Sequence, residues 1–309
     1  MIKDETSRMG LGAFKGLGGI FATGRIILDM VFNQTGIQVS PPDLFEAGMV
    51  REFAGSLTFV CASAGNHGMA VAEGARLFGA KSRIHICATV PHTFEDRLQK
   101  TGAQVIRSGN TYEESLSAAT NEANSCGHIL LADGSWNGNT SAPALVMEGY
   151  ALMAEEILIT CRKDNCFPEQ IYLQAGVGGL AAAFSHMVRN TWPVQPEIYI
   201  VEPDAAPCLA ESFQLGKAVT VSGPVSNMGR LDCKDASHLA FDILKHCDVQ
   251  CISISDDEAN IAEDILNTVG IQSTPSGSAG LAGLLKRNRV QPPIESSRSL
   301  IIVTEGDNE

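Results

Sequence analysis

Short continuous apolar runs alternate with segments of helical periodicity along most of this chain, an order that is typical of βα units. In the first half the apolar runs predict strands at residues 57–62, 82–90, 103–107 and 128–133. Helical patterns lie between them at 69–79, 94–100 and 112–124. A turn-rich segment with a double proline, 33–43, precedes the series. The pattern therefore predicts a compact unit built on a parallel sheet.

A second series follows a long helical pattern at 142–161. Its expected strands are 171–175, 197–201, 249–254 and 299–303, and its expected helices are 180–190, 236–247, 256–269 and one that opens at 274. Another helix is expected at 17–31. Two such series define an α/β fold with two parallel-sheet domains. We assign residues 1–33 and 150–309 to a larger domain and residues 34–149 to a smaller one.

Composition narrows the class of protein. Apolar residues make up 44% of the 309 residues and charged residues 18%, as in a globular protein that buries a full core. The formal net charge of −13 argues against a general nucleic-acid binder, because phosphate backbones require basic surfaces. The N-terminus lacks the apolar region of a signal peptide, and no apolar run is long enough to span a membrane. Nine cysteines without a C-x-x-C pair indicate a reduced, cytoplasmic protein, and we expect no metal site.

Lys15 stands in a stretch that is unusually rich in glycine, S-R-M-G-L-G-A-F-K-G-L-G-G at 7–19. Glycine lets the backbone turn tightly and approach other groups closely. A lysine that acts as an amine nucleophile must be partly desolvated, and it commonly forms a Schiff base. Lys15 is therefore a candidate catalytic residue. The alternative is a solvated lysine that simply opens the following helix.

Two glycine loops follow expected strands and open helices, an arrangement that presents backbone N–H groups to an anion. The loop at 176–181 fits G-x-G-x-x-A, and Glu202 ends the next strand 26 residues after Gly176. That spacing is close to a dinucleotide fingerprint, so an NAD(P)-dependent Rossmann oxidoreductase is one interpretation. The loop S-A-G-N-H-G at 63–68 adds a hydroxyl and a carboxamide. Its N–H groups and Ser63 suit a carboxylate, and Asn66 can donate to a phenolate-like oxygen.

Taken together, G-A-F-K-G-L-G-G, S-A-G-N-H-G, G-V-G-G and a closing T-E-G-D resemble the fold-type-II, tryptophan synthase β-like enzymes that use pyridoxal 5′-phosphate (PLP). The chain is most similar to the diaminopropionate and threonine ammonia-lyases of that group. This likeness rests on K-D-E-T-S-R-M-G-L-G-A-F-K, D-G-S-W-N-G, E-G-Y, V-E-P and V-T-E-G-D, and it covers essentially the whole chain.

The resemblance implies a role for each candidate residue. Lys15 would form the Schiff base with PLP and later move the α-proton of the substrate. Asp133 would serve as an acid or base. Alternatively, Asp133 is only a turn residue at the end of a strand. Asn66 would bond the ring oxygen of the cofactor, and Thr304 would lie beside the pyridine nitrogen. The cofactor phosphate would bind the turn formed by Gly176, Val177, Gly178 and Gly179. The substrate carboxylate would bind Ser63, Ala64, Gly65 and Asn66.

Departures from the family pattern qualify this expectation. The diaminopropionate enzymes have an aspartate where this chain has Ala64. Arg230 stands in a segment that is small and apolar in the family, and it would bind a second substrate carboxylate or pair with Asp232; the pair is favoured slightly. Relatives also carry several tens of residues before K-D-E-T, on the order of one βα layer of the larger domain.

The resulting prediction is a cytoplasmic, homodimeric, PLP-dependent ammonia-lyase. It would eliminate the β-substituent of a small L-amino acid, 2,3-diaminopropionate-like or serine/threonine-like, to give a 2-keto acid and ammonia. The partner is thus a small amino acid, with no nucleic acid and no membrane. Two alternatives stay open: a catalytically degenerate PLP-binding protein of the same fold, and the Rossmann oxidoreductase.

Overall fold

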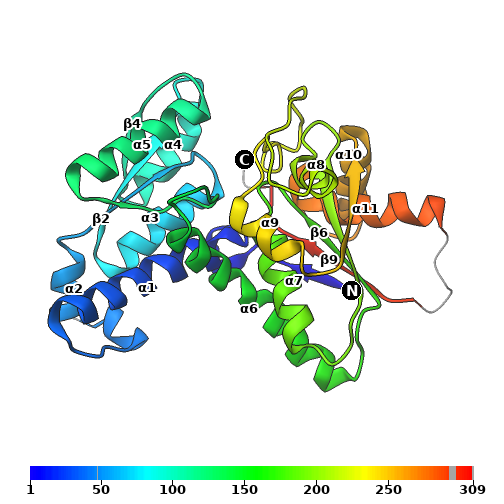
Figure 1. The fold of residues 1–309 in the computed structure, drawn as a ribbon, viewed down its shortest axis with the longest axis horizontal. Helices are drawn as coiled ribbons and strands as arrows, with labels where there is room; N and C mark the ends of the chain where they lie inside the picture. Colours follow the sequence, from blue (N-terminus) through cyan, green and yellow to red (C-terminus); the bar gives the residue numbers. More distant parts are fainter. Residues whose placement is uncertain (47, 292–296, 308–309) are drawn as a thin grey trace. The chain divides into compact units, whose positions relative to one another are not determined.

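The computed structural model describes residues 1–46, 48–291 and 297–307. The chain divides into two compact units (Figure 1). The larger unit comprises Met1–Phe14, Gly134–Thr140 and Tyr150–Glu309, and the smaller unit comprises Lys15–Asp133 and Ser141–Gly149. Among the described residues, no helix combines the length and the apolar character that crossing a membrane requires.

The place of helix α1 (Lys15–Thr35) differs from the expected domain boundaries, which put residues 1–33 in the larger domain. The helix belongs to the smaller unit because it packs closely against α3 (Asn66–Phe78). A methyl group at Gly19 would lie only 2.5 Å from the β-carbon of Ala70, and one at Gly74 only 2.9 Å from the hydroxyl oxygen of Thr23. Glycines on both helices therefore permit the contact.

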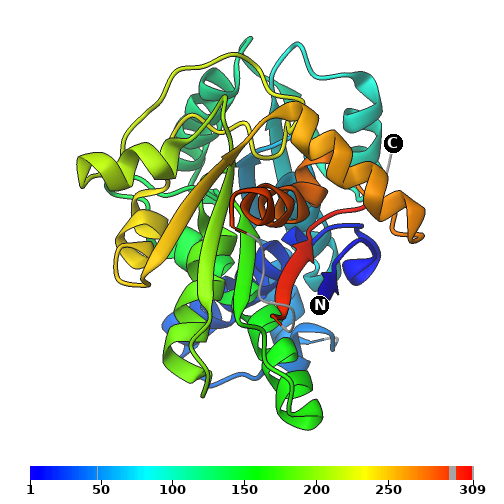
Figure 2. The same cartoon turned by 90° about the vertical axis from the view of Figure 1, so that its right-hand side faces the viewer.

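The larger unit is built on a five-stranded parallel sheet with the order β1-β9-β6-β7-β8. Its strands are β1 (Ile2–Asp4), β6 (Gln170–Gln174), β7 (Glu197–Pro203), β8 (Val249–Ile254) and β9 (Ser299–Val303). Its helices are η1 (Arg8–Gly10), most of α6 (Ser141–Asp164), α7 (Gly179–Thr191), α8 (Cys208–Leu215), α9 (His238–Leu244), α10 (Asp256–Thr268) and α11 (Pro275–Val290). Helix α11 lies in front of the strands in Figure 2 and packs beside α10, while α7 and α9 pack together.

The smaller unit is built on a four-stranded parallel sheet with the order β4-β3-β2-β5. Its strands are β2 (Thr58–Ala62), β3 (Lys81–Ile86), β4 (Gln104–Arg107) and β5 (Ile129–Leu130). Besides α1, α3 and the start of α6, its helices are η2 (Pro41–Leu44), α2 (Met49–Ala54), α4 (His92–Lys100) and α5 (Tyr112–Cys126). The expected α/β fold with two parallel sheets is confirmed.

Strand order locates one candidate ligand position in each sheet. In the larger unit the chain runs outward from β6 to β7 and β8, whereas β9 lies on the other side of β6. In the smaller unit it runs from β2 to β3 and β4, whereas β5 lies on the other side of β2. Open parallel sheets bind ligands outside the carboxyl ends of the strands at such reversals of order. The loops that follow β6 and β9, and those that follow β2 and β5, are therefore the places to examine.

Several element boundaries differ from the sequence expectations. The strand expected at 82–90 ends at Ile86, because the next segment turns away and Ala88 N–H donates to the carbonyl of Gly109. The strand expected at 128–133 is reduced to Ile129–Leu130. Helix α3 begins at Asn66 rather than near Met69. The short elements β1, α2 and α8 are too brief for periodicity to predict.

Candidate active site

Lys15 and Asp133 form an ion pair in the smaller unit. The Lys15 Nζ lies 2.8 Å from the Asp133 Oδ2, and the two side chains are 22% and 23% exposed. Lys15 is the first residue of α1, and Asp133 follows β5 after two residues, at the reversal of strand order. The structure thus brings together two of the residues that the sequence assigned to catalysis, 118 positions apart.

The charge of Lys15 decides the protonation state of Asp133. Burial is the largest single influence and raises the pKa of this carboxyl, but the charge and hydrogen bond of Lys15, together with His67 and a backbone hydrogen bond, hold the pKa well below the ordinary value of an aspartate. Asp133 is therefore ionised while Lys15 carries its proton. Removing the positive charge from Lys15 removes the largest lowering influence, so the pKa of Asp133 rises and the carboxyl takes up a proton more readily.

The loop at 63–68 follows β2, and helix α3 begins within it. No side chain caps the helix N-terminus, where the first N–H groups lack helical acceptors. A methyl group at Gly68 would lie 2.0 Å from the carbonyl oxygen of Ser63, so only glycine fits this turn. Ser63, Ala64, Gly65 and Asn66 are half-buried on this loop. The arrangement suits a carboxylate, and a role of this loop in binding one stays a prediction.

His67 is a fixed part of the same loop. It is 3% exposed, and its Nε2 lies 2.9 Å from the carbonyl oxygen of Leu131. Because a carbonyl only accepts, Nε2 carries the proton, and Nδ1 is left without a hydrogen-bond partner among the described residues. Burial lowers the pKa of the imidazole, so the ring is neutral. His67 joins the start of α3 to the segment after β5.

The loop Gly176–Gly179 follows β6 in the larger unit and opens α7 without a side-chain cap. Gly178 has φ +102°, a conformation that side chains rarely adopt, and a methyl group there would lie 3.1 Å from the side chain of Leu209. A methyl group at Gly176 would lie 2.8 Å from the sulfur of Cys233. Packing against Leu209 and Cys233 thus requires glycine at both positions, and the turn presents the uncapped first N–H groups of α7, which are donors that suit an anion such as phosphate.

Thr304 follows β9, beside this loop in the strand order. It is 4% exposed, and its hydroxyl oxygen lies 3.1 Å from the Nε2 of Gln174. The amide nitrogen of Gln174 also lies 2.9 Å from the Gly277 carbonyl oxygen and 3.0 Å from that of Ile302. Gln174 is a residue that sequence reasoning missed, although a glutamine within the apolar run I-Y-L-Q-A was a detectable signal.

Among the described residues, the ion pair found for Arg230 is with Glu305 and not with Asp232, contrary to the favoured expectation. Its Nε lies 3.5 Å from the Oε2 of Glu305, and its side chain is 38% exposed. Asp232 instead contacts the Nζ of Lys234 at 2.5 Å. The loop of Arg230 borders the glycine turn, since a methyl group at Gly176 would lie 3.2 Å from the Arg230 carbonyl oxygen. A role for Arg230 toward a substrate carboxylate stays a prediction.

Glu202 is unsuited to the dinucleotide interpretation. Its side chain is buried, and its two oxygens accept hydrogen bonds from the backbone N–H groups of Leu209 at 2.8 Å and Ala210 at 2.9 Å. Burial raises the pKa of this carboxyl to about 7, against the lowering effect of those bonds. The carboxylate that would hold a ribose hydroxyl is thus committed to the start of α8.

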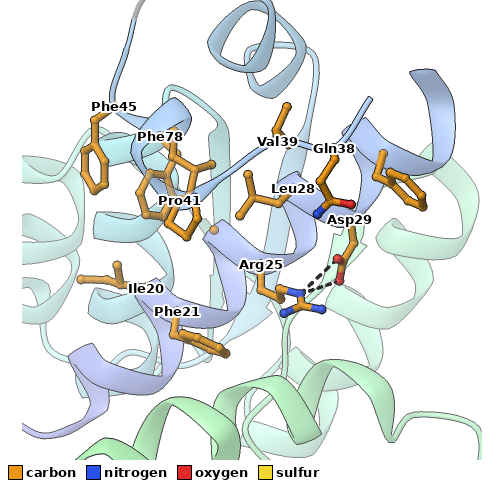
Figure 3. A pocket seen from close by; sticks show the side chains of 13 residues that line it. Ile20, Phe21, Arg25, Leu28, Asp29, Gln38, Val39, Pro41, Phe45 and Phe78 are labelled. Carbon is orange, nitrogen blue, oxygen red and sulfur yellow. Dashed lines mark hydrogen bonds and ion pairs between the residues drawn. The ribbon is translucent and has the colours of Figure 1, made fainter. Parts of the chain in front are cut away.

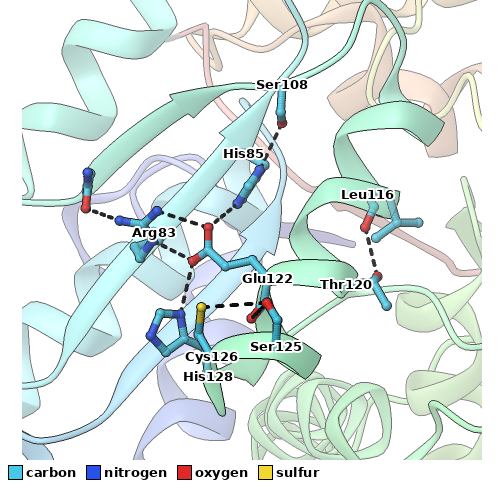
Figure 4. Close-up of polar contacts among 10 residues, drawn as sticks. Arg83, His85, Ser108, Leu116, Thr120, Glu122, Ser125, Cys126 and His128 are labelled. Carbon is cyan, nitrogen blue, oxygen red and sulfur yellow. Dashed lines mark hydrogen bonds and ion pairs between the residues drawn. The ribbon is translucent and has the colours of Figure 1, made fainter.

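Other polar and apolar features of the smaller unit lie elsewhere. A cavity of about 580 Å³ is bordered by phenylalanines of α1 and its neighbours, and no candidate site residue lines it (Figure 3). In a polar cluster, the Glu122 carboxylate accepts hydrogen bonds from Arg83, His85 and His128 (Figure 4). Within the described ranges, no group of three or more His, Cys, Asp or Glu side chains is placed to hold a metal ion.

Comparison with known proteins places this geometry in a family. Residues 2–305 match the family described as "Pyridoxal-phosphate dependent enzyme", and the chain belongs to that family. The Rossmann oxidoreductase interpretation is therefore wrong. Diaminopropionate ammonia-lyase of Escherichia coli strain K12 is 29% identical over 326 residues, which cover 100% of this chain and 80% of the relative.

More distant members agree. L-threonine ammonia-lyase of Thermotoga maritima is 24% identical over 252 residues, covering 81% of this chain and 58% of the relative. The crystal structure of selenomethionine-incorporated holo diaminopropionate ammonia lyase from Escherichia coli superposes with a TM-score of 0.85 at 27% identity. That match covers 99% of this chain and 79% of the other. The expected resemblance to fold-type-II PLP enzymes is confirmed.

The residues present fit the chemistry of this cofactor. A phosphate requires N–H donors, and the turn Gly176–Gly179 opens α7 without a side-chain cap on its first N–H groups. A pyridine nitrogen requires a hydroxyl or a carboxyl partner, and the Thr304 hydroxyl is buried with a hydrogen to donate. An aldehyde requires an amine held away from bulk water, and Lys15 is 22% exposed.

Proposed function

We propose that this protein is a PLP-dependent ammonia-lyase that eliminates the β-substituent of a small L-amino acid, 2,3-diaminopropionate-like or serine/threonine-like. Loss of that substituent with a proton, followed by hydrolysis of the resulting imine, gives a 2-keto acid and ammonia. The observation that carries the proposal is the partly buried ion pair between Lys15 and Asp133. It supplies an amine nucleophile and an adjacent group that changes its affinity for protons when the amine loses its charge.

PLP, when bound, supplies an electron-accepting ring that stabilises negative charge at the α-carbon of an amino acid. Gly176, Val177, Gly178 and Gly179 hold the phosphate through backbone N–H groups, and the Thr304 hydroxyl donates to the ring nitrogen. Asn66 donates to the ring oxygen. A hydroxyl cannot protonate the ring nitrogen as a carboxylic acid can, so the ring withdraws electrons less strongly. This favours prompt loss of a β-substituent.

The remaining residues handle substrate and protons. The N–H groups of the loop Ser63–Asn66 bind the α-carboxylate, and Arg230 serves a second carboxylate where the substrate has one. Lys15 Nζ takes the proton from the α-carbon. While Lys15 is uncharged, the Asp133 carboxyl holds a proton taken from the ammonium group of the substrate. The charge that Lys15 gains with the α-proton then lowers the pKa of Asp133, which gives its proton to the leaving group.

A visible spectrum and a trapping experiment test the proposal. Purified protein titrated with PLP should gain the absorption band of a protonated Schiff base, and borohydride should fix the cofactor on the peptide that contains Lys15. Lys15→Ala should lose the label, whereas Lys234→Ala, which removes another ion-paired lysine, should keep it. A protein that shows no spectral change with PLP would contradict the assignment. If the absorption band appears but no tested amino acid yields a keto acid, the protein binds PLP without turnover.

The proposal also includes a cytoplasmic location and a homodimer. The odd number of cysteines without a C-x-x-C pair supports a reducing compartment. The homodimer follows from the resemblance to the family, whose members are usually dimers. Light scattering coupled to size-exclusion chromatography measures the mass in solution, for comparison with the 32.8 kDa chain.

A further inference from the structure

Gln174 is the last residue of β6, and its side chain is 2% exposed. Its Nε2 lies 2.9 Å from the carbonyl oxygen of Gly277 in the first turn of α11, and 3.0 Å from that of Ile302 in β9. The hydroxyl oxygen of Thr304 lies 3.1 Å from the same nitrogen. One amide thus connects three segments of the larger unit at the reversal of strand order.

The two carbonyl groups fix which way the amide points. Carbonyl oxygens only accept hydrogen bonds, so the nitrogen of the amide, and not its oxygen, must face Gly277 and Ile302. Rotating the amide by half a turn would set three oxygens against one another. In the observed orientation the Oε1 of Gln174 is buried without a hydrogen-bond partner among the described residues. The surroundings therefore determine the orientation, which is often ambiguous for glutamine.

This orientation determines the role of the Thr304 hydroxyl. An amide NH₂ donates and does not accept, so Thr304 cannot give its hydrogen to Gln174. In the part of the chain that the structure describes, Gln174 provides the one side-chain hydrogen bond of Thr304, so the hydroxyl hydrogen is available for another acceptor. If a protonated ring nitrogen donated to Thr304, that hydrogen would remain buried and unpaired. Leaving a buried donor unpaired disfavours a state by on the order of 10- to 100-fold.

We propose that Gln174 is a positioning residue that makes the Thr304 hydroxyl a hydrogen-bond donor and thereby keeps the ring nitrogen of PLP unprotonated. This inference rests on the proposed function, which places the ring nitrogen at Thr304. Gln174 itself touches neither cofactor nor substrate in this scheme. It acts through the direction of one hydrogen bond, and so controls how strongly the ring withdraws electrons.

The test uses the protein reconstituted with PLP that carries ¹⁵N in its ring. In the unmodified protein the ring-nitrogen resonance should stay at an unprotonated position across neutral pH. Gln174→Met keeps the length of the side chain but removes the donor, so the carbonyl groups of Gly277 and Ile302 compete for the Thr304 hydrogen. The resonance should then move toward the pyridinium position as the pH falls, and PLP affinity should drop by about 2- to 10-fold. Gln174→Leu provides a second variant if the first folds poorly.

Two controls separate positioning from general stability. Gln170→Met removes another buried glutamine from the same strand and should leave the resonance unchanged. Thr304→Val removes the hydroxyl, and in that background Gln174→Met should have no further effect on the resonance, because the two changes act through one hydrogen bond.

Specific outcomes would overturn the inference. An unchanged resonance in a folded, PLP-loaded Gln174→Met protein would show that the amide does not control the ring nitrogen. An equal change in the Thr304→Val background would show that Gln174 acts by another route, and an equal change in Gln170→Met would show a general effect of the strand. Failure of the unmodified protein to bind PLP, visible in the first titration, would instead contradict the proposed function.

Discussion

Replacing Asp133 by asparagine tests the catalytic half of the proposal most directly. The change keeps the shape of the side chain and an oxygen that accepts from Lys15, but it removes the negative charge and the ability to carry a proton. The protein should still give the PLP spectrum and the borohydride label on Lys15. Turnover of 2,3-diaminopropionate should fall by roughly 10²–10⁴, the usual contribution of a general acid or base.

The structure also sets the size of the electrostatic change. At 2.8 Å and an effective dielectric constant near 20, the attraction between Lys15 and Asp133 is on the order of 6 kcal/mol before desolvation is subtracted. Removing one partner of a largely buried pair costs about 3–5 kcal/mol of stability at most. Thermal unfolding of the variant is therefore measured first, and turnover is assayed well below its unfolding midpoint. Asp29→Asn, which breaks the exposed pair with Arg25, should change neither property.

The choice of substrate decides between catalysis and structure. An amine leaves only with a proton, whereas chloride leaves without one, so the Asp133→Asn variant should lose far more activity on diaminopropionate than on β-chloroalanine. The assay is keto-acid release from both substrates by the same preparation. An equal loss on the two substrates would refute the reasoning, because it would mean that Asp133 shapes the site without protonating the leaving group.

Two further predictions concern other parts of the smaller unit. Ala64 carries a methyl group where an aspartate would supply a base for D-amino acids, so we expect activity on L substrates. Ala64→Asp should raise the rate on D substrates more than the rate on L substrates, measured as keto-acid release from each enantiomer. Comparable rates on the two enantiomers in the unmodified protein would contradict this. Hydrogen bonds from Arg83 lower the pKa of Glu122 to about 2 in the folded protein. The ionised carboxylate therefore stabilises the folded state fully above the pKa of the unfolded chain, near 4.5, and this stabilisation is lost as the pH falls toward 2. Glu122→Gln should therefore remove on the order of 1–3 kcal/mol of unfolding free energy at neutral pH and less in acid. Urea titrations at several pH values measure this loss, with Glu73→Gln, which breaks the pair with Arg76, as the control. An equal loss of unfolding free energy at all pH values would argue against the prediction.

The sequence predicted the sheets and the candidate chemistry because both depend on local patterns. Continuous apolar runs such as 171–175 form buried strands, and glycine loops after them open helices, so the positions of Lys15, Asn66 and Gly176 could be assigned to loop ends. That Lys15 meets Asp133 was implied only by the family resemblance, since the two residues are 118 positions apart.

Contacts across the chain explain what the sequence did not provide. The glycines beside Lys15 looked like clearance for a ligand, yet Gly19 serves the packing of α1 on Ala70, and a methyl group at Gly149 would collide with the carbonyl of Leu17. Arg230 stands two residues from Asp232, but the side chain reaches Glu305 instead. Charge spacing along a loop does not determine a pair when the fold brings a third group nearer.

The pairing of β1 with β9 has a consequence for synthesis on the ribosome. Ile2 pairs with Ile301, so β1 stays without this neighbour until translation has reached β9. The residues of the smaller unit end at Gly149, and β9 begins 150 residues later at Ser299. At about 5–20 residues per second, the smaller unit has roughly 8–30 seconds to fold before β9 is made. Lys15 and Asp133 can therefore meet on a nascent protein that still lacks β9 and Thr304.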